Sequence, residues 1–127
     1  KTPKLGPSLP QDCVCPVGRR PYHTILTAQA STYQRWQTLI FYHHFRKAQR
    51  LNPCTEMTGF TRLLASANGG PDDLMEYMPT VTVSQLGFDK TRGFQVINRP
   101  WTMLKFLEMK VCTRAKAASL FGGRHAQ

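Results

Sequence analysis

The sequence of 127 residues predicts one domain of the α/β class, in which a mostly parallel sheet is flanked by helices. Short β-branched, apolar runs alternate along the chain with longer segments in which apolar residues recur at helical spacing. The first two such runs are separated by a helical segment, so we expect them to be parallel neighbours joined by a right-handed crossover. A hydrophobic content of 41% with 19% charged residues is typical of a globular domain.

The first ordered elements are predicted after a segment rich in Pro and Gly. The run 23–27 reads as a strand buried on both faces of the sheet, and residues 28–30 as a brief turn. Ser31 and Gln34 form a capping-box pattern, so a helix is expected from Ser31 to about Gln49. We expect its buried face to hold Gln37, Ile40, Phe41, His44, Ala48 and Leu51, and its outer face to hold Arg35, Thr38, Tyr42, Arg46 and Gln49.

The second half of the chain continues the alternation. We expect strands at 60–65 and 80–83, with a turn at 68–71 and a short helix at 73–76 between them. A fourth short strand is expected at 94–97. Pro100 occupies the position that favours proline at a helix start, so a second long helix is predicted from there.

The net charge of +10 divides into +3 for residues 1–20, +3 for residues 21–109 and +4 for residues 110–127. Because most of the excess lies at the two ends, the pattern does not favour nucleic-acid binding, which usually gathers Lys and Arg on one face. We therefore expect a linker or stalk at 1–20, a folded domain at 21–109 and a basic tail at 110–127. A non-catalytic basic module that binds nucleic acid or protein remains an alternative.

Ligand-binding residues are expected at the carboxyl ends of the strands, where open α/β sheets bind ligands. Four candidates lie at the first strand-to-helix turn: Thr27, Ala28, Gln29 and Ser31. This turn has neither the dinucleotide fingerprint nor the phosphate-binding loop of nucleoside triphosphatases.

Three further candidates lie elsewhere in the chain. Asn98 and Arg99 precede Pro100, where a guanidinium would reinforce a helix dipole toward a diphosphate. Arg62 lies within an apolar strand, so it should meet a carboxylate such as Asp72 or Asp73, or a bound phosphate.

No metal site is expected in this sequence. Cys13, Cys15, Cys54 and Cys112 are too irregularly spaced for a zinc site, and adjacent histidines at 43 and 44 point about 100° apart on a helix. A disulfide involving Cys54 is compatible with an oxidising compartment, but its partner cannot be deduced from spacing. The sequence also has no apolar run near the 20 residues of a membrane span.

Segments in one order and spacing resemble the hydroxyproline O-arabinosyltransferases of plants and algae over residues 21–108. They are Pro21-Tyr-His-Thr-Ile-Leu-Thr-Ala28, Trp36-Gln37, Gly59-Phe-Thr-Arg-Leu-Leu64, Asp73-Leu-Met-Glu76, Pro79-Thr80, Arg92-Gly93, Val96-Ile-Asn-Arg-Pro-Trp101 and Leu107-Glu108. A related branch that galactosylates serine has Asn-Lys-Pro-Ala at the last motif, so Arg99 and Trp101 favour the arabinosyl branch, with the serine O-galactosyltransferases as a further alternative.

The resemblance implies a partial GT-A-like, Rossmann-type fold that transfers arabinofuranose from a UDP-sugar to hydroxyproline of secreted proteins. It also implies a Golgi type II membrane protein whose anchor lies outside this chain. The seven candidates would then bind the donor. In the family, a divalent cation such as Mn²⁺ is held by an acidic motif after the last helix, whereas residues 110–127 contain no acidic residue. We therefore expect this chain to be truncated relative to the family and to transfer little or no sugar alone.

Overall fold

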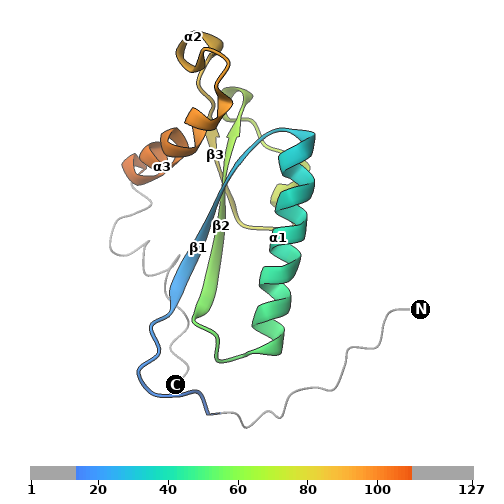
Figure 1. Ribbon diagram of the computed structural model, residues 1–127, viewed down its shortest axis with the longest axis vertical. Helices are drawn as coiled ribbons and strands as arrows, with labels where there is room; N and C mark the ends of the chain where they lie inside the picture. The colour runs from blue at the N-terminus through green and yellow to red at the C-terminus, as the bar shows by residue number, and fades with distance from the viewer. Residues whose placement is uncertain (1–13, 110–127) are drawn as a thin grey trace, which may run out of the picture.

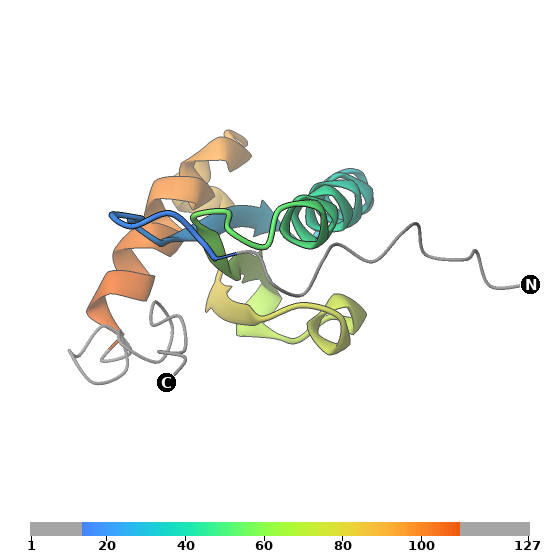
Figure 2. The same ribbon diagram turned by 90° about the horizontal axis from the view of Figure 1, so that it is seen from below.

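The computed structural model describes residues 14–109. One sheet of three parallel strands runs in the order β1-β2-β3, and helices cover both of its faces (Figures 1 and 2). The main elements are β1 (Tyr22–Gln29), α1 (Thr32–Leu51), β2 (Met57–Ser66), β3 (Thr80–Ser84) and α3 (Asn98–Glu108). The predicted fold class, an α/β fold with a parallel sheet flanked by helices, is confirmed.

Burial differs sharply between the central strand and its neighbour. Every residue of β2 from Phe60 to Ser66 is buried, because both faces are covered and both edges are paired. In β1, by contrast, only Ala28 is buried, because β2 is its one pairing partner among residues 14–109. The prediction of a first strand buried on both faces is therefore wrong. The turn expected at 28–30 is also too early, since Ala28 and Gln29 still pair with β2.

The start of α1 follows half of the predicted capping box. Ser31 is the N-cap, and its hydroxyl accepts a hydrogen bond from the Gln34 amide at 3.3 Å. The Gln34 side chain does not return to the cap residue, however. Its carbonyl oxygen accepts from the Gln29 amide at 2.6 Å, which ties the end of β1 to the first turn of α1.

The buried face of α1 was predicted wrongly. Thr38 and Phe45 are buried, whereas Ile40, Phe41 and Leu51 are exposed. Aromatic packing decides the orientation: the rings of Tyr42 and Phe45 lie 4.9 and 5.3 Å from the ring of Phe60.

A polar residue that was expected to face solvent also lies on this buried side. The Gln49 amide donates to the backbone carbonyls of Met57 and Thr58 at 2.9 and 3.2 Å, so it is satisfied where β2 begins. The core beneath α1 consists of Phe45, Phe60, Leu74 and Met78, with Leu26, Tyr42 and Met57 packed against it.

The connection from β2 to β3 contains two short 3₁₀ turns. The first spans Ala67–Gly69, where Asn68 and Gly69 have φ of 53° and 67°, and the second spans Asp73–Glu76. The predicted turn and short helix are thus both present. Leu74 is buried beneath α1, which fixes this connection against the same face of the sheet.

The segment before the last helix differs from the prediction. The fourth strand expected at 94–97 is instead a 3₁₀ turn, Gln95–Ile97, which follows a short helix α2 (Phe88–Thr91). The turn runs directly into α3, so α3 begins at Asn98 rather than at Pro100. Pro100 still lies in the first turn, where its missing amide costs no hydrogen bond.

No helix within residues 14–109 is long and apolar enough to cross a membrane. The part of the predicted linker that the structure describes, residues 14–20, forms neither helix nor strand but contacts the folded unit near Cys54. The basic tail expected at 110–127 lies outside the described residues.

Candidate functional site

Three cavities adjoin the carboxyl end of β1, and Ala28 and Gln34 line all of them. The α1-side cavity, of about 210 Å³, lies between α1, Arg62 and Asp72. The α3-side cavity, of about 60 Å³, lies against Gln95, Asn98 and Arg99, and the edge cavity, of about 150 Å³, lies beside Leu26 and Phe41. The strand-to-helix turn predicted as a binding site is therefore bordered by three cavities.

The backbone of this turn is held in one conformation by hydrogen bonds. The Ala30 amide donates to the Ala65 carbonyl at 2.9 Å, and the Ser31 amide donates to the Gln29 carbonyl at 2.8 Å. Gln34 completes the turn through the Gln29 amide. Gln34 was expected only as a cap residue, and its position in all three cavities follows from the helix starting directly beside β1.

The seven predicted residues all line these cavities, but they divide between them. Arg62 and Ser31 line the α1-side cavity, whereas Asn98 lines the α3-side cavity. Thr27 and Arg99 line both the α3-side and the edge cavities. Ala28 and Gln29 connect the two sides. The structure therefore brings the candidates together around one strand end without placing them in a single pocket.

Arg62 is paired with a carboxylate, which was one of the two partners that the sequence analysis left open. Its side chain is buried, and it contacts both oxygens of Asp72, at 2.9 Å from Nη1 to Oδ2 and 2.5 Å from Nη2 to Oδ1. Nε donates to the Thr80 hydroxyl at 3.1 Å. The charge of Arg62 is thus balanced within the protein, so this side of the site has little net attraction for an anion.

A second arginine–aspartate pair lies on the surface beside the same cavity. Both guanidinium ends of Arg35 donate to the carboxylate of Asp73. This hydrogen bond from Arg35 lowers the pKa of Asp73 below its ordinary value and raises the pKa of Arg35. The two pairs link α1, β2 and the connection at 72–73 around a charge-balanced cavity.

Asn98 has a structural role in the α3-side wall. Its Oδ1 accepts from the Leu86 amide at 2.9 Å, and its Nδ2 donates to the carbonyl and side-chain oxygens of Gln95, each at 3.2 Å. Gln95 also accepts from the Gln29 side chain at 2.8 Å. Gln95 was missed as a site residue because it was expected in a strand, and it is the residue that connects β1 to α3.

Arg99 differs from the two paired arginines. It is exposed in the first turn of α3, and it forms no ion pair with any residue between 14 and 109. It lines two cavities, neither of which has an acidic residue in its wall. The free positive charge of the site therefore lies on its α3 side.

Trp101, part of the motif that carries the family resemblance, holds α3 in place without lining a cavity. Its indole Nε1 donates to the Ser84 carbonyl at 2.9 Å, and Lys105 Nζ lies 4.7 Å from the ring centroid. These contacts attach α3 to the end of β3. Trp101 lines none of the three cavities.

Residues 14–109 contain no group of three or more His, Cys, Asp or Glu side chains that could hold a metal ion. The rings of His43 and His44 lie edge to face at 5.3 Å on the exposed side of α1. The residues available at the cavities are amides, hydroxyls, backbone groups and one unpaired guanidinium, which suit a polar, anionic organic ligand.

Comparison with known proteins gives a consistent family assignment. Residues 22–117 match the model of the Hydroxyproline O-arabinosyltransferase family N-terminal domain. The chain is 44% identical over 90 residues to hydroxyproline O-arabinosyltransferase RDN2 of Medicago truncatula, covering 71% of this chain and 24% of that protein. It is 41% identical over 88 residues to hydroxyproline O-arabinosyltransferase 3 of Arabidopsis thaliana, covering 69% and 24%.

The pea relative, hydroxyproline O-arabinosyltransferase NOD3 of Pisum sativum, is 39% identical over 90 residues, covering 71% of this chain and 26% of that protein. No solved structure matches the chain. The chain spans about a quarter of the length of the curated relatives it matches. The family match over most of the folded region shows that the chain belongs to the hydroxyproline O-arabinosyltransferase family, in the part described as its N-terminal domain.

Proposed function

We propose that the cavities at the carboxyl end of β1 bind a UDP-sugar, and that the protein serves the transfer of arabinofuranose to hydroxyproline of secreted proteins. The observation that carries the proposal is the convergence of three cavities on Ala28 and Gln34, at the point where the chain leaves the sheet. Ligands in open α/β sheets bind at such strand ends. The relatives' activity, hydroxyproline O-arabinosyl transfer, supports the second part of this proposal.

The charges divide the proposed site into two parts. The α1-side cavity is charge-balanced by the Arg62–Asp72 and Arg35–Asp73 pairs, which suits a neutral base and ribose. The α3 side carries the unpaired guanidinium of Arg99, which suits an anionic diphosphate. We therefore expect the uridine to lie toward α1 and the diphosphate to lie toward Arg99.

The site lies on a turn whose side chains leave the backbone accessible. Ala28, Ala30 and Ser31 are small, so a nucleotide can approach the chain closely. The first amides of α1 have no partner within the helix and carry the positive end of its dipole. The amides of Gln29, Ala30 and Ser31 are bonded within the protein, so the backbone donors open to the nucleotide would be the first amides of α1.

The remaining features of the reaction belong to the same proposal. A divalent cation such as Mn²⁺ would neutralise the diphosphate of the leaving UDP, and no candidate ligand set lies within residues 14–109. Residues 110–127 contain no Asp or Glu. We therefore expect this chain to bind the donor without transferring its sugar, and we propose a Golgi location for the protein.

Calorimetric titration of the 127-residue chain with UDP, uridine and ADP tests the binding proposal. UDP should bind more tightly than uridine by at least about tenfold, since one charge-assisted contact to phosphate contributes roughly 1.5–3 kcal/mol. It should also bind more tightly than ADP, which carries the same phosphates on a larger base. Equal binding of UDP and ADP would contradict a uridine pocket, and no binding of either nucleotide would overturn the proposed site.

The sugar and the activity need separate assays. UDP-arabinofuranose should compete with UDP more effectively than UDP-galactose does. The reverse order would favour the serine O-galactosyltransferase alternative. Turnover of UDP-arabinofuranose by this chain, with Mn²⁺ and a hydroxyproline peptide, would contradict the expected inactivity. Tight RNA binding with a steep dependence on salt would instead support a basic binding module.

A further inference from the structure

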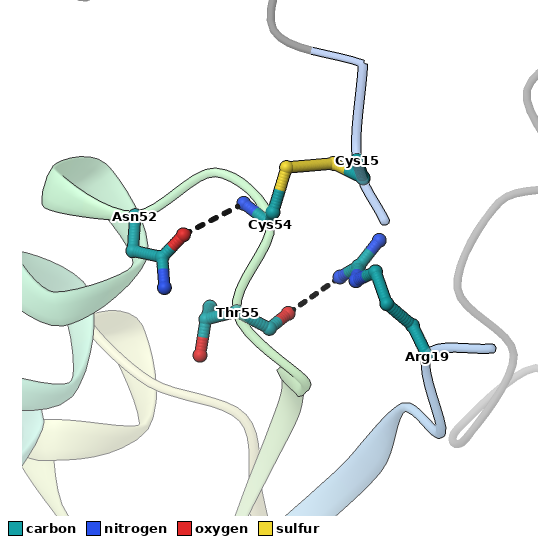
Figure 3. The surroundings of a disulfide bond; sticks show 5 residues. All are labelled: Cys15, Arg19, Asn52, Cys54 and Thr55. Carbon is teal, nitrogen blue, oxygen red and sulfur yellow. Dashed lines mark hydrogen bonds between the residues drawn. A yellow bond between two sulfur atoms is a disulfide. The ribbon is translucent and has the colours of Figure 1, made fainter. Parts of the chain in front are cut away.

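The segment before β1, residues 14–21, is attached to the loop between α1 and β2 by one covalent bond and two hydrogen bonds. Figure 3 shows the disulfide and the hydrogen bond between Arg19 and Thr55. Cys15 and Cys54, 39 positions apart, form a disulfide with their Cα atoms 5.3 Å apart. Arg19 Nη2 donates to the Thr55 carbonyl at 2.6 Å. The Arg20 amide donates to Glu56 Oε1 at 3.0 Å.

This attachment lies at the amino end of the sheet. Tyr22 pairs with Met57 there, and the Tyr22 amide donates to the Glu56 carbonyl at 2.8 Å. The cavities lie toward the opposite end of β1, where residues from Leu26 to Gln29 line them. The two ends of this strand are roughly 25 Å apart. No residue of the attachment lines these three cavities, so the attachment is separate from the proposed donor site.

Apolar packing contributes little to holding the segment. Val14 and Val17 are both exposed, at 94% and 104%. Cys15 and Arg19 are the half-buried residues between 14 and 20, and the other residues there are exposed. Without the disulfide, the segment would be held mainly by two hydrogen bonds, one part-buried and one exposed, whose net contributions to stability are small.

We propose that the Cys15–Cys54 bond is a redox-dependent clasp that holds residues 14–21 at the amino end of the sheet. The clasp requires an oxidising compartment, where such bonds persist. The clasp fixes the position of residues 14–21 at the amino end of the sheet. The proposed donor site lies toward the other end of the sheet. Reduction by a dithiol opens it: the S–S bond breaks, each cysteine gains one electron and one proton, and the dithiol becomes a cyclic disulfide.

Limited digestion with trypsin tests the clasp, because Arg19 lies inside it. The bond between Arg19 and Arg20 should be protected in the oxidised chain, whereas the bond after Arg20 resists trypsin in any state because Pro21 follows. Reduction should accelerate the cut after Arg19 at least about tenfold, before cuts appear in the folded unit, since local opening precedes global unfolding. Reduction should also lower Tm by roughly 10–20 °C.

Variants identify the pairing and keep the test valid if reduction unfolds the chain. Cys15→Ser and Cys54→Ser should each give the fast cut under oxidising conditions, whereas Cys13→Ser, two positions earlier, should retain protection. In a separate experiment, the Cys13→Ser chain is unfolded without reduction and digested to completion, and mass spectrometry should then show peptide 5–19 joined to peptide 51–62. Loss of protection in Cys13→Ser would assign the bond to Cys13 instead, and equal cutting of oxidised and reduced chains would overturn the clasp.

Discussion

Arg62 and Arg99 lie on opposite sides of the same strand end, yet the protein uses their charges differently. Arg62 is buried within β2 and meets Asp72 in a two-point contact. Arg99 is exposed in the first turn of α3 and forms no ion pair within residues 14–109. The charge of Arg62 is therefore neutralised by a partner within the fold, whereas the charge of Arg99 is available to a ligand.

The cost of desolvation explains this division. A guanidinium in the middle of a buried strand must be paired, because an isolated charge there would cost several kcal/mol. Arg99 keeps its hydration at the surface and needs no internal partner. Substitutions at the two positions should therefore affect different properties: folding stability for Arg62 and ligand affinity for Arg99.

The largest effect is expected for Arg62→Met. It removes the buried cation, leaves Asp72 without its partner, and should lower the free energy of unfolding by about 3 kcal/mol, measured by urea denaturation. The double variant Arg62→Met with Asp72→Leu should recover most of this loss, because no unpaired charge remains. A loss below about 1 kcal/mol in the single variant would contradict a role of Arg62 in folding stability.

The next effect concerns Asn98, the buried neighbour of Arg99. Asn98→Ala removes the acceptor of the Leu86 amide and both contacts to Gln95, so it should lower the free energy of unfolding by about 1–2 kcal/mol. Arg99→Ala, at the next position of the same helix turn, should change stability by less than about 0.5 kcal/mol. Equal losses in the two variants would mean that Arg99 also supports the fold.

Ligand affinity should show the opposite order. Arg99→Ala should weaken UDP binding about tenfold in calorimetric titration, while uridine, which has no phosphate, should bind as before. Lys90→Ala removes the same charge from α2, which lines none of the three cavities, and should leave UDP affinity unchanged. Equal weakening by both variants would indicate a general charge effect rather than a contact at Arg99.

Sequence patterns predicted the three strands and the start of α1 because these depend on local signals. The apolar run 60–65 predicted β2, the alternation at 80–83 predicted β3, and Ser31 with Gln34 predicted the start of α1. An arginine in an apolar strand implied a partner, and Asp72 is that partner. The edge position of β1 could not be predicted in this way, because burial depends on which strands pair, and pairing is not a local property.

Failures of the sequence analysis arose where polar groups are buried with specific partners. Helical spacing placed Gln49 on the outer face of α1, but its amide satisfies two carbonyls at the start of β2. Gln95 was missed because an apolar run around it suggested a strand. Its contact to Gln29 joins residues 66 positions apart, so one sequence without its fold gave no signal for it.

The smallest effect is expected for the surface pair, and it should depend on pH. Arg35 lowers the pKa of Asp73 in the folded state, so the pair contributes stability above the unfolded pKa of about 4 and loses it as pH falls through the folded value. Asp73→Asn should therefore be slightly less stable than the unmodified chain near pH 7, and the difference should shrink below pH of about 4. Thermal melts of both chains across this range measure the difference, and a gap that stays constant to pH of about 2 would contradict the ion pair.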